Sequence, residues 1–339
     1  MYRRSSTILL AVTATVAVIG VAVPAGAAGN SFRVKTRVTD ATDPSLVNPW
    51  GMSQGPNTPV WVSDNGTGMS TLYKATSSPK VALTVTIPGA SPTGTVFNGS
   101  TKFAVNGAPG KFLFATESGV LSGWNSGTAA VQERAVKGAV FKGLAIATLQ
   151  DGRQRLFATD FHGGHVDVFN GLWQRLHPKG AFVDNKLPAG YAPFGITTLR
   201  GNVYVSYAKQ DSMRHDDVAG VGHGFVDKFS TTGVLLRRMI KHGALNSPWG
   251  MTIAPSGFGP FGGDLLVGNF GDGRIHAYDA RTGVAKGTLK NRAGHVIVLH
   301  GLWGLLFGNG TSAPTTTLMF TSGPGGEQHG KWGTIDAAA

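Results

Sequence analysis

Short runs of β-branched and aromatic residues recur along the chain, and each run ends in a polar turn. Several runs alternate apolar and polar residues with a period of two, as half-buried strands do. No stretch after residue 28 has the 3.6-residue spacing of an amphipathic helix. The most regular runs are Pro59–Asp64, Lys111–Thr116, Arg155–Asp160, Asn202–Tyr207, Asp264–Asn269 and Thr317–Ser322. The pattern predicts an all-β protein.

A second motif, usually an aromatic residue followed by glycine, precedes most of these runs. Asn48-Pro-Trp-Gly-Met52 returns almost unchanged as Asn246-Ser-Pro-Trp-Gly-Met251. The glycines of this motif are Gly51, Gly143, Gly195, Gly250 and Gly304, with gaps of 92, 52, 55 and 54 residues. Because the first gap is close to two periods, we expect a degenerate repeat within it, around Lys102–Asn106. Six units of about fifty residues with four strands each are typical of a six-bladed β-propeller.

The two ends of the chain indicate how the ring closes. Phe32–Val38 reads as a strand that stands before the first repeat, and the last unit ends near Lys331–Ile335, after its third strand. We therefore expect the N-terminal strand to complete the last blade and to remove the open edges. An open solenoid would need polar capping repeats, which the sequence lacks.

The first 28 residues read as a signal peptide rather than as part of the fold. Arg3 and Arg4 precede an uncharged stretch, Ile8–Val23, which ends in the small residues Ala25–Ala28. A basic start, an apolar centre and a small-residue end are the three parts of a secretory signal. The alternative is an uncleaved membrane anchor, and the arginine pair leaves both Sec and twin-arginine export open. We expect a secreted protein with residues 29–339 as a single propeller domain.

Composition fits an exported, compact protein. The chain has no cysteine, so its stability must come from packing without disulfides. Without Arg3 and Arg4, 28 basic residues face 18 acidic ones, which suits attraction to an anionic cell-surface polymer or simply a basic, soluble surface. The sequence has no basic helix and no base-stacking motif, so nucleic acid is not expected as a partner. We also expect no transmembrane segment after residue 28, and a monomer.

The repeats carry a family resemblance. The Pro-Trp-Gly-Met openings, each followed by a strand, a turn and another strand, resemble the NHL-type repeats of six-bladed propellers. Over its mature length the chain is similar to an uncharacterised family of secreted bacterial propeller proteins, through stretches such as His215–Gly220, Leu245–Gly250 and Leu265–Gly273. The resemblance implies the fold and lends no catalytic assignment.

Unusual polar residues gather in the loops expected on one face of the disc. Loops that enter the first strand and loops that join the second strand to the third share the same end of the channel in an antiparallel blade. The candidates for a ligand site there are Asp64, Asn65, Glu117, Asp160, His162, Lys209, Asp211, Asn269, Glu327 and His329. Convergence on one rim suits a binding site on a rigid scaffold. The same residue types are also ordinary turn formers.

One of these loops is much longer than the others. The insertion Lys209–His223 offers nitrogen and oxygen ligands for zinc or another divalent ion, namely His215, Asp216, Asp217 and His223. Their spacing matches no established metal motif, and Lys209 or Arg214 could pair with the acids instead. His162 and His165, which flank a Gly-Gly turn, could with Asp160 add ligands from a neighbouring blade. A divalent metal is therefore a hypothesis for this loop.

The aromatic residues before the glycines favour packing over ligand stacking. Trp50, Phe194, Trp249 and Trp303 occupy the same place in their repeats, as packing positions between blades would. The Leu265–Gly273 glycines resemble a phosphate loop, but no helix follows them. The chain also lacks a Gly-x-Ser-x-Gly elbow and any thiol nucleophile.

Three functions remain open on the sequence. The first is a secreted propeller that binds an extracellular protein, a glycan or a cell-wall polymer through its loop-rich face. The second is a metal-assisted lyase or hydrolase with its site at the channel mouth, by analogy with other six-bladed propellers. The third is a purely structural surface protein.

Overall fold

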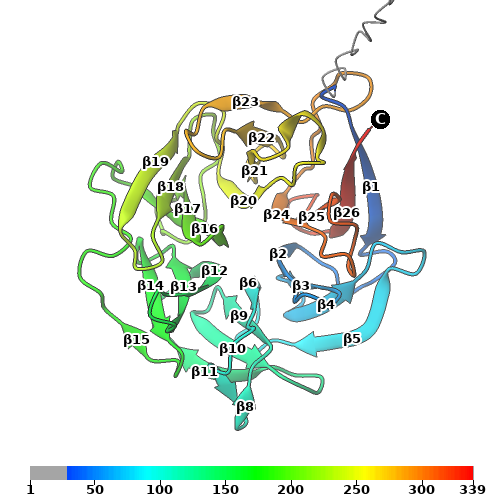
Figure 1. Cartoon of the computed structure of the whole chain (residues 1–339). Helices are drawn as coiled ribbons and strands as arrows, with labels where there is room; N and C mark the ends of the chain where they lie inside the picture. Colours follow the sequence, from blue (N-terminus) through cyan, green and yellow to red (C-terminus); the bar gives the residue numbers. More distant parts are fainter. Residues whose placement is uncertain (1–28, 339) are drawn as a thin grey trace, which may run out of the picture.

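The computed structural model describes residues 29–338, which form a ring of six four-stranded antiparallel sheets around a central channel (Figure 1). The expected six-bladed β-propeller is thereby confirmed. The predicted signal peptide, residues 1–28, lies outside the described residues. A single 3-10 turn, η1 (Gly259–Phe261), is the helical element of the described chain. No helix within residues 29–338 is long and apolar enough to cross a membrane.

The blades follow one another in chain order, and the first strand of each lines the channel. Blade 1 contains β2 (Pro49–Ser53), β3 (Val60–Asp64), β4 (Met69–Tyr73) and β5 (Lys80–Thr86). Blade 2 contains β6 (Pro92–Phe97), β9 (Phe112–Thr116), β10 (Val120–Trp124) and β11 (Val131–Ala135). Blade 3 contains β12 (Phe141–Thr148), β13 (Gln154–Asp160), β14 (His165–Asn170) and β15 (Arg175–Leu176). Blades 4 and 5 are β16 (Tyr191–Leu199), β17 (Asn202–Lys209), β18 (Phe225–Phe229) and β19 (Leu235–Lys241), then β20 (Pro248–Ile253), β21 (Leu265–Asn269), β22 (Ile275–Tyr278) and β23 (Ala285–Thr288).

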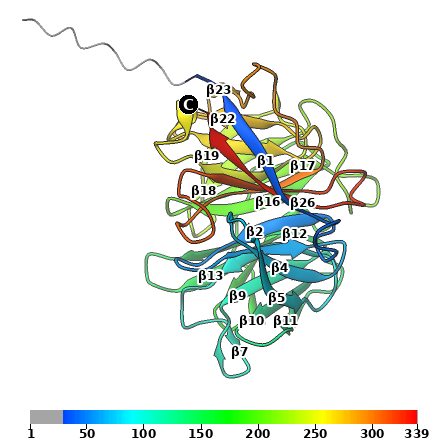
Figure 2. The same cartoon turned by 90° about the vertical axis from the view of Figure 1, so that its right-hand side faces the viewer.

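Blade 6 closes the ring with strands from both ends of the chain. It contains β24 (Leu302–Phe307), β25 (Leu318–Ser322), β26 (Lys331–Ala337) and, on the outside, β1 (Phe32–Thr39). β1 pairs antiparallel with β26 from Phe32 opposite Ala337 to Thr39 opposite Lys331, and Figure 2 shows the two strands side by side. The expected closure by the N-terminal strand is confirmed. Phe32 is buried against Phe258 and Phe261, so the closing strand also belongs to the core.

The degenerate repeat is not where the spacing predicted it. The first strand of blade 2 is β6, which contains Gly94. Lys102–Asn106 instead lies in the next connection and includes β7 (Ala104–Val105), which forms a small hairpin with β8 (Ala108–Pro109). The prediction of this position was wrong because blade 2 has Thr93 where four of the other repeats have an aromatic residue. Gly94 marks the position of this repeat better than the residue before it does.

The repeated glycine allows the inner strands of neighbouring blades to approach closely. A Cβ on Gly94 would collide with the backbone of Leu144, and one on Gly195 would collide with the carbonyl oxygen of Trp249. Hydroxyl groups add hydrogen bonds across the same boundaries. Ser206 Oγ, for example, donates to the Pro248 carbonyl at 2.6 Å. The motif therefore marks contacts between blades, not only turns.

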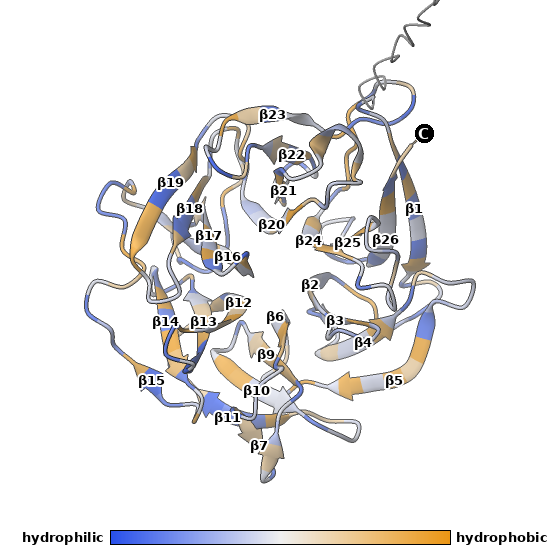
Figure 3. Ribbon diagram, viewed as in Figure 1, coloured by the Kyte–Doolittle hydropathy of each residue, from blue (hydrophilic) through white to orange (hydrophobic). Residues whose placement is uncertain are grey.

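Apolar side chains fill the spaces between blades, while hydrophilic positions concentrate on outer strands such as β1 and β11 (Figure 3). Trp50, Trp249 and Trp303 meet one another in the middle of the channel, with Trp50 and Trp303 stacked at a centroid distance of 3.5 Å. All three are buried, as is Phe194 beside them. The interpretation of these aromatic residues as packing is confirmed. We call this cluster the aromatic plug.

Candidate functional site

A buried lysine is the centre of the polar network on the loop-rich side of the aromatic plug. Lys142, in β12, has a side chain that is only 2% exposed, and its Nζ bonds Glu117 Oε1 at 2.5 Å and Asp216 Oδ1 at 3.0 Å. Nζ also lies 5.2 Å from the centre of the Trp50 ring. Burial alone would lower the pKa of Lys142, but the two carboxylates outweigh it and raise the pKa, so the ammonium stays charged.

Sequence reasoning missed Lys142, although a signal for it existed. The residue before the repeat glycine is Trp50, Phe194, Trp249 or Trp303 in four blades, and these side chains form the aromatic plug. In blade 3 this position is Lys142. A cation in a series of buried aromatic residues has to reach a counter-ion, because an unpaired buried charge is costly. The departure from the repeat therefore marks the site.

The network continues from Lys142 across the mouth of the channel. Asn65 Nδ2 donates to Glu117 Oε2 at 3.0 Å, and Asn48 Nδ2 donates to Asn65 Oδ1 at 3.3 Å and to Glu327 Oε2 at 2.6 Å. Trp303 Nε1 in turn donates to Asn48 Oδ1 at 3.0 Å, which ties the polar layer to the plug below it. We call this set, Asn48, Asn65, Glu117, Lys142, Asp216 and Glu327, the mouth network.

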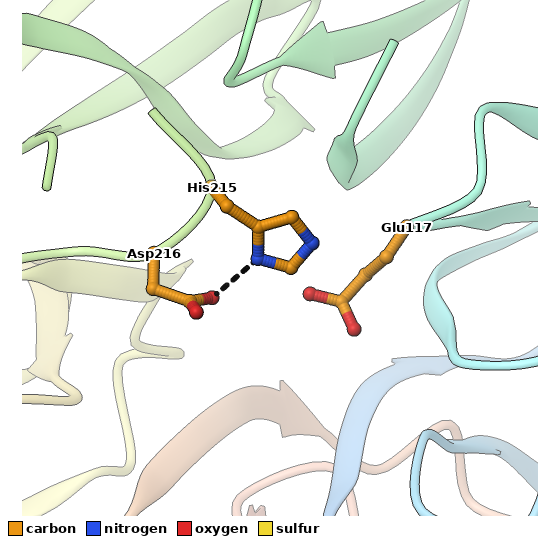
Figure 4. Close-up of side chains that lie close together, drawn as sticks. All are labelled: Glu117, His215 and Asp216. Carbon is orange, nitrogen blue, oxygen red and sulfur yellow. Dashed lines mark hydrogen bonds and ion pairs between the residues drawn. The ribbon is translucent and has the colours of Figure 1, made fainter. Parts of the chain in front are cut away.

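The long insertion brings its own side chains into the mouth network. His215 and Asp216 approach from one side of the mouth and Glu117 from the other (Figure 4). His215 Nδ1 lies 3.0 Å from Asp216 Oδ1, and one ligand atom from each of the three residues falls within 4.8 Å of the others. The side chains of His215 and Asp216 are 46% and 66% exposed. A ligand arriving from solvent can therefore reach both.

The insertion is held in place at several points, which limits its freedom. Gln210 Nε2 donates to the Phe161 carbonyl of blade 3 at 2.5 Å, and Gly220 N donates to Asn246 Oδ1 of the blade 5 entry at 2.7 Å. Asp211 Oδ1 accepts the His215 backbone N–H at 2.8 Å, so this candidate residue shapes the loop from within. The anchoring presents His215 and Asp216 in a fixed place.

Charge at the mouth is only partly balanced. Burial lifts the pKa of Glu327, and the nearby Glu117 and Asp216 carboxylates raise it further, although its hydrogen bond from Asn48 opposes the shift. Asp216 behaves in the opposite way, because Lys142 and His215 outweigh the effect of burial and lower its pKa. One ammonium thus faces three carboxyl groups, and the mouth favours ligands that carry positive charge or hydrogen-bond donors.

The four insertion residues predicted as a metal set do not converge on one point. Within residues 29–338, the donor groups close enough to share an ion are Glu117 with His215 and Asp216, and Asp160 with His165 and Asp167. Asp217 is largely buried, which raises its pKa, and His223 Nδ1 contacts the Val218 carbonyl oxygen at 2.8 Å. Asp216 lies at a bend and bonds Lys142, whereas Asp217 forms a bridge with Gln210, so the two carboxylates are held in different surroundings.

Several other candidates from the sequence have local roles. Asp64 and Asn269 are fully buried, and burial raises the pKa of Asp64 well above its usual range. Asp160 Oδ1 accepts the backbone N–H groups of Val140 and Gly163, as a turn-forming aspartate does. These three side chains are closed to a ligand.

The remaining candidates lie around the rim, outside the mouth network. His329 pairs with Asp40 at 2.9 Å, while His162 and Lys209 are exposed. His165 lies 3.1 Å from Asp167, but Arg175 also bonds Asp167 and so occupies the space that an ion would need. The second group of possible metal donors is therefore already neutralised by an arginine.

The other end of the channel has a different character. On the far side of the aromatic plug, the inner strands enclose a cavity of about 270 Å³. Met52, Thr95, Ile146, Thr197 and Leu306 are among its lining residues, and no charged residue of the described chain lines it. Of the two ends of the channel, the loop-rich mouth is therefore the one with charged groups.

Comparisons with known proteins add a family and confirm the fold. No family model matches the chain. Protein R648 of Acanthamoeba polyphaga mimivirus, which is uncharacterised, is 32% identical over 300 residues, covering 81% of this chain and 72% of R648. Protein L690 of the same virus, also uncharacterised, is 33% identical over 288 residues, covering 78% of this chain and 74% of L690. These relatives are viral, whereas the sequence resemblance suggested bacterial ones.

Solved structures resemble this chain in fold alone. A protein of unknown function from Bacteroides thetaiotaomicron matches with a TM-score of 0.56 and 11% identity, covering 91% of this chain and 73% of that one. A streptogramin B lyase structure matches with a TM-score of 0.53 and 11% identity, covering 91% of this chain and 98% of the lyase. At such identities a shared propeller says nothing about shared chemistry.

Proposed function

This chain belongs to the same family as the uncharacterised mimivirus proteins R648 and L690, and from its mouth network we propose a function in binding. The protein is a secreted propeller that holds a polyhydroxylated ligand, a glycan or a cell-wall polymer, at the loop-rich mouth of its channel. The pattern of residues 1–28 supports the extracellular location. A monomer suffices, because one ring supplies every residue of the site.

The observation that carries the proposal is the buried Lys142 between Glu117 and Asp216. It fixes one acceptor group from blade 2 and one from the insertion before any ligand arrives, so little ordering is left for binding to do. Ligand hydroxyl groups can donate to the carboxylate oxygens that Lys142 leaves partly free. The tryptophans of the plug do not stack on the ligand, because the side chains are buried: Trp50 is 2% exposed and Trp303 is 1% exposed.

Titration calorimetry with defined saccharides tests this proposal. Chitotetraose, cellotetraose, maltotetraose and glucosamine are titrated into the mature chain and into Asp216→Asn. We expect at least one saccharide to bind, and Asp216→Asn to weaken it by about tenfold, because a hydrogen bond to a charged acceptor is lost. Asp151→Asn is the matched control, since Asp151 is an exposed carboxylate paired with Arg153, away from the mouth. Equal binding by Asp216→Asn and the parent would contradict the proposal.

A second function, metal-assisted lyase or hydrolase chemistry, is favoured by the meeting of Glu117, His215 and Asp216. These donors suit zinc or a similar divalent ion, which would polarise a substrate carbonyl or activate water when bound. His215 could move the proton, with Asp216 holding its Nδ1 side. A metal ion at this place has to compete with Lys142, which already bonds both the Glu117 and the Asp216 carboxylates.

Metal analysis of the chain, purified without chelators, separates the two functions. One equivalent of a divalent ion that His215→Ala loses would favour the metal-assisted enzyme. A metal-free protein that still binds a saccharide would favour binding alone.

A further inference from the structure

A small cavity on the outside of the ring, between blades 3 and 4, has two arginines over an apolar interior. Its volume is about 190 Å³. Phe157, Val168 and Phe182 line it and are almost completely buried, and the half-buried Leu176 of β15 joins them. An apolar cavity of about 150 Å³ already accepts a benzene ring. This one has room for a chain of about six carbon atoms.

The walls of the cavity are fixed by contacts between two blades. Phe182 comes from the connection that follows β15, and its ring meets the rings of Phe157 and Phe229 at centroid distances of 5.0 and 5.3 Å. Its backbone N–H donates to the Gly233 carbonyl at 2.8 Å. The space is therefore bounded by packed residues rather than by mobile side chains.

The two arginines are not fully compensated. Arg153 pairs with the exposed Asp151 at 2.5 Å. Arg155 is half-buried, and its guanidinium donates a hydrogen bond to the carbonyl of the preceding Gln154 at 2.9 Å. Among residues 29–338 no carboxylate pairs with Arg155. Burial and repulsion by Arg153 lower its pKa, although an arginine keeps its charge at any ordinary pH.

Apolar side chains continue from the cavity to the surface. Val183 follows the lining residue Phe182 and is 48% exposed, and Val234 follows the turn that carries the lining residues Thr231 and Thr232 and is 59% exposed. Exposed apolar residues beside an uncompensated guanidinium suit a ligand with an apolar part and an anionic end.

We propose that this cavity is a second binding site, which takes a small aliphatic carboxylate. The carboxylate pairs with the Arg155 guanidinium at the entrance, and the chain lies against Phe157, Val168 and Leu176. The site is separate from the channel mouth and does not depend on the function proposed there. A free acid is favoured over a peptide end because the cavity is small and the Phe157 and Phe182 rings, which pack against each other, are among its walls.

Ligand-observed NMR and calorimetry with hexanoate test the site on the mature chain. Hexanoate should bind saturably with one equivalent, and 1-hexanol and hexylamine should bind at least tenfold more weakly, because neither can pair with Arg155. Arg155→Met should weaken hexanoate by about tenfold or more. Arg237→Met, an exposed arginine of β19 that does not line the cavity, is the matched control and should change nothing.

A second variant keeps the test decisive if Arg155→Met folds poorly. Leu176→Phe fills the cavity from a half-buried position and should abolish hexanoate binding with the arginines intact. The proposal is overturned if hexylamine binds as tightly as hexanoate. It is also overturned if a folded Arg155→Met variant binds hexanoate as tightly as the parent does. A peptide with a C-terminal leucine that outcompetes hexanoate would also overturn it, in favour of a peptide site.

Discussion

The two ends of the channel are built from the same six inner strands, yet only one of them carries charge. At the loop-rich mouth, Lys142 joins Glu117 and Asp216 above the aromatic plug. At the other end, the cavity that contains Thr95 and Thr197 is lined without a charged residue of the described chain. The strands give both ends the same frame, so the difference comes from the loops and from one substitution in the plug. Function on this scaffold is a matter of what the repeat leaves variable.

The largest effect should come from breaking the frame that both ends share. Removing residues 29–40 takes away β1 and exposes the edge of β26. We expect aggregation, or a melting temperature lower by more than about 10 °C, because the buried Phe32 and Val38 are lost together with the pairing. The shortened chain is compared with a chain that starts at Gly29, and light scattering and thermal denaturation are measured for both. Equal melting of the two chains would mean that the ring closes without β1.

A smaller effect should distinguish the two ends. Lys142→Met leaves Glu117 without its buried partner and should lower the free energy of unfolding by about 2 to 3 kcal/mol, less than for a fully buried pair because Asp216 is 66% exposed. Thr197→Val, at the uncharged end, should cost less than about 0.5 kcal/mol. Urea denaturation measures both.

The loss of stability in Lys142→Met should be partly reversed by removing the two carboxylate charges that lose their lysine partner. Adding Glu117→Gln and Asp216→Asn should recover part of the lost stability, since the acids then need no counter-ion. If the triple variant is no more stable than Lys142→Met, lost packing rather than stranded charge explains the effect.

A third effect concerns pH and should arise at the charged end of the channel but not at the uncharged one. The folded chain raises the pKa of Glu327 above 4.5, chiefly through burial, so it holds this proton more tightly than the unfolded chain. The stability that Glu327 contributes is therefore fully present below pH 4.5 and is lost as the pH rises through the window up to the raised pKa. Glu327→Gln should make the fall less steep.

The pH measurement is clearer in a background without Asp227, another buried acid whose pKa is raised. Asp227, in β18, has a pKa raised to about 7, chiefly by burial and also by Asp184, so stability falls for the same reason between pH 3.8 and about 7. Denaturation midpoints are compared in Asp227→Asn with and without Glu327→Gln. Identical slopes would show that Glu327 ionises in the folded chain as it does in the unfolded one.

The blades, the ring closure and the packing role of Trp50 followed from the sequence because periodic patterns report on repeated contacts. Blade 2 was misplaced because Thr93 breaks the aromatic pattern while Gly94 keeps the spatial constraint. The glycine is required by the closeness of the next strand, and a search for glycine spacing alone would have found it.

The site was less predictable. Its face and some members, such as Glu117, Asn65 and Glu327, follow from strand order. Burial does not follow from strand order, because Asp64 and Asn269 occupy the same kind of loop position and yet are fully buried. Lys142 was missed because the candidates were sought in loops, whereas Lys142 lies in strand β12, and only its counter-ions from other blades reveal its role.

The central claim, that the ligand site is the charged mouth, is tested most directly by one calorimetric comparison. The saccharide that binds the mature chain most tightly is titrated into the parent, into Glu117→Gln and into Thr197→Val. The account predicts that Glu117→Gln weakens binding by about tenfold or more, and that Thr197→Val stays within about twofold of the parent. The claim is contradicted if Thr197→Val loses the saccharide while Glu117→Gln retains it.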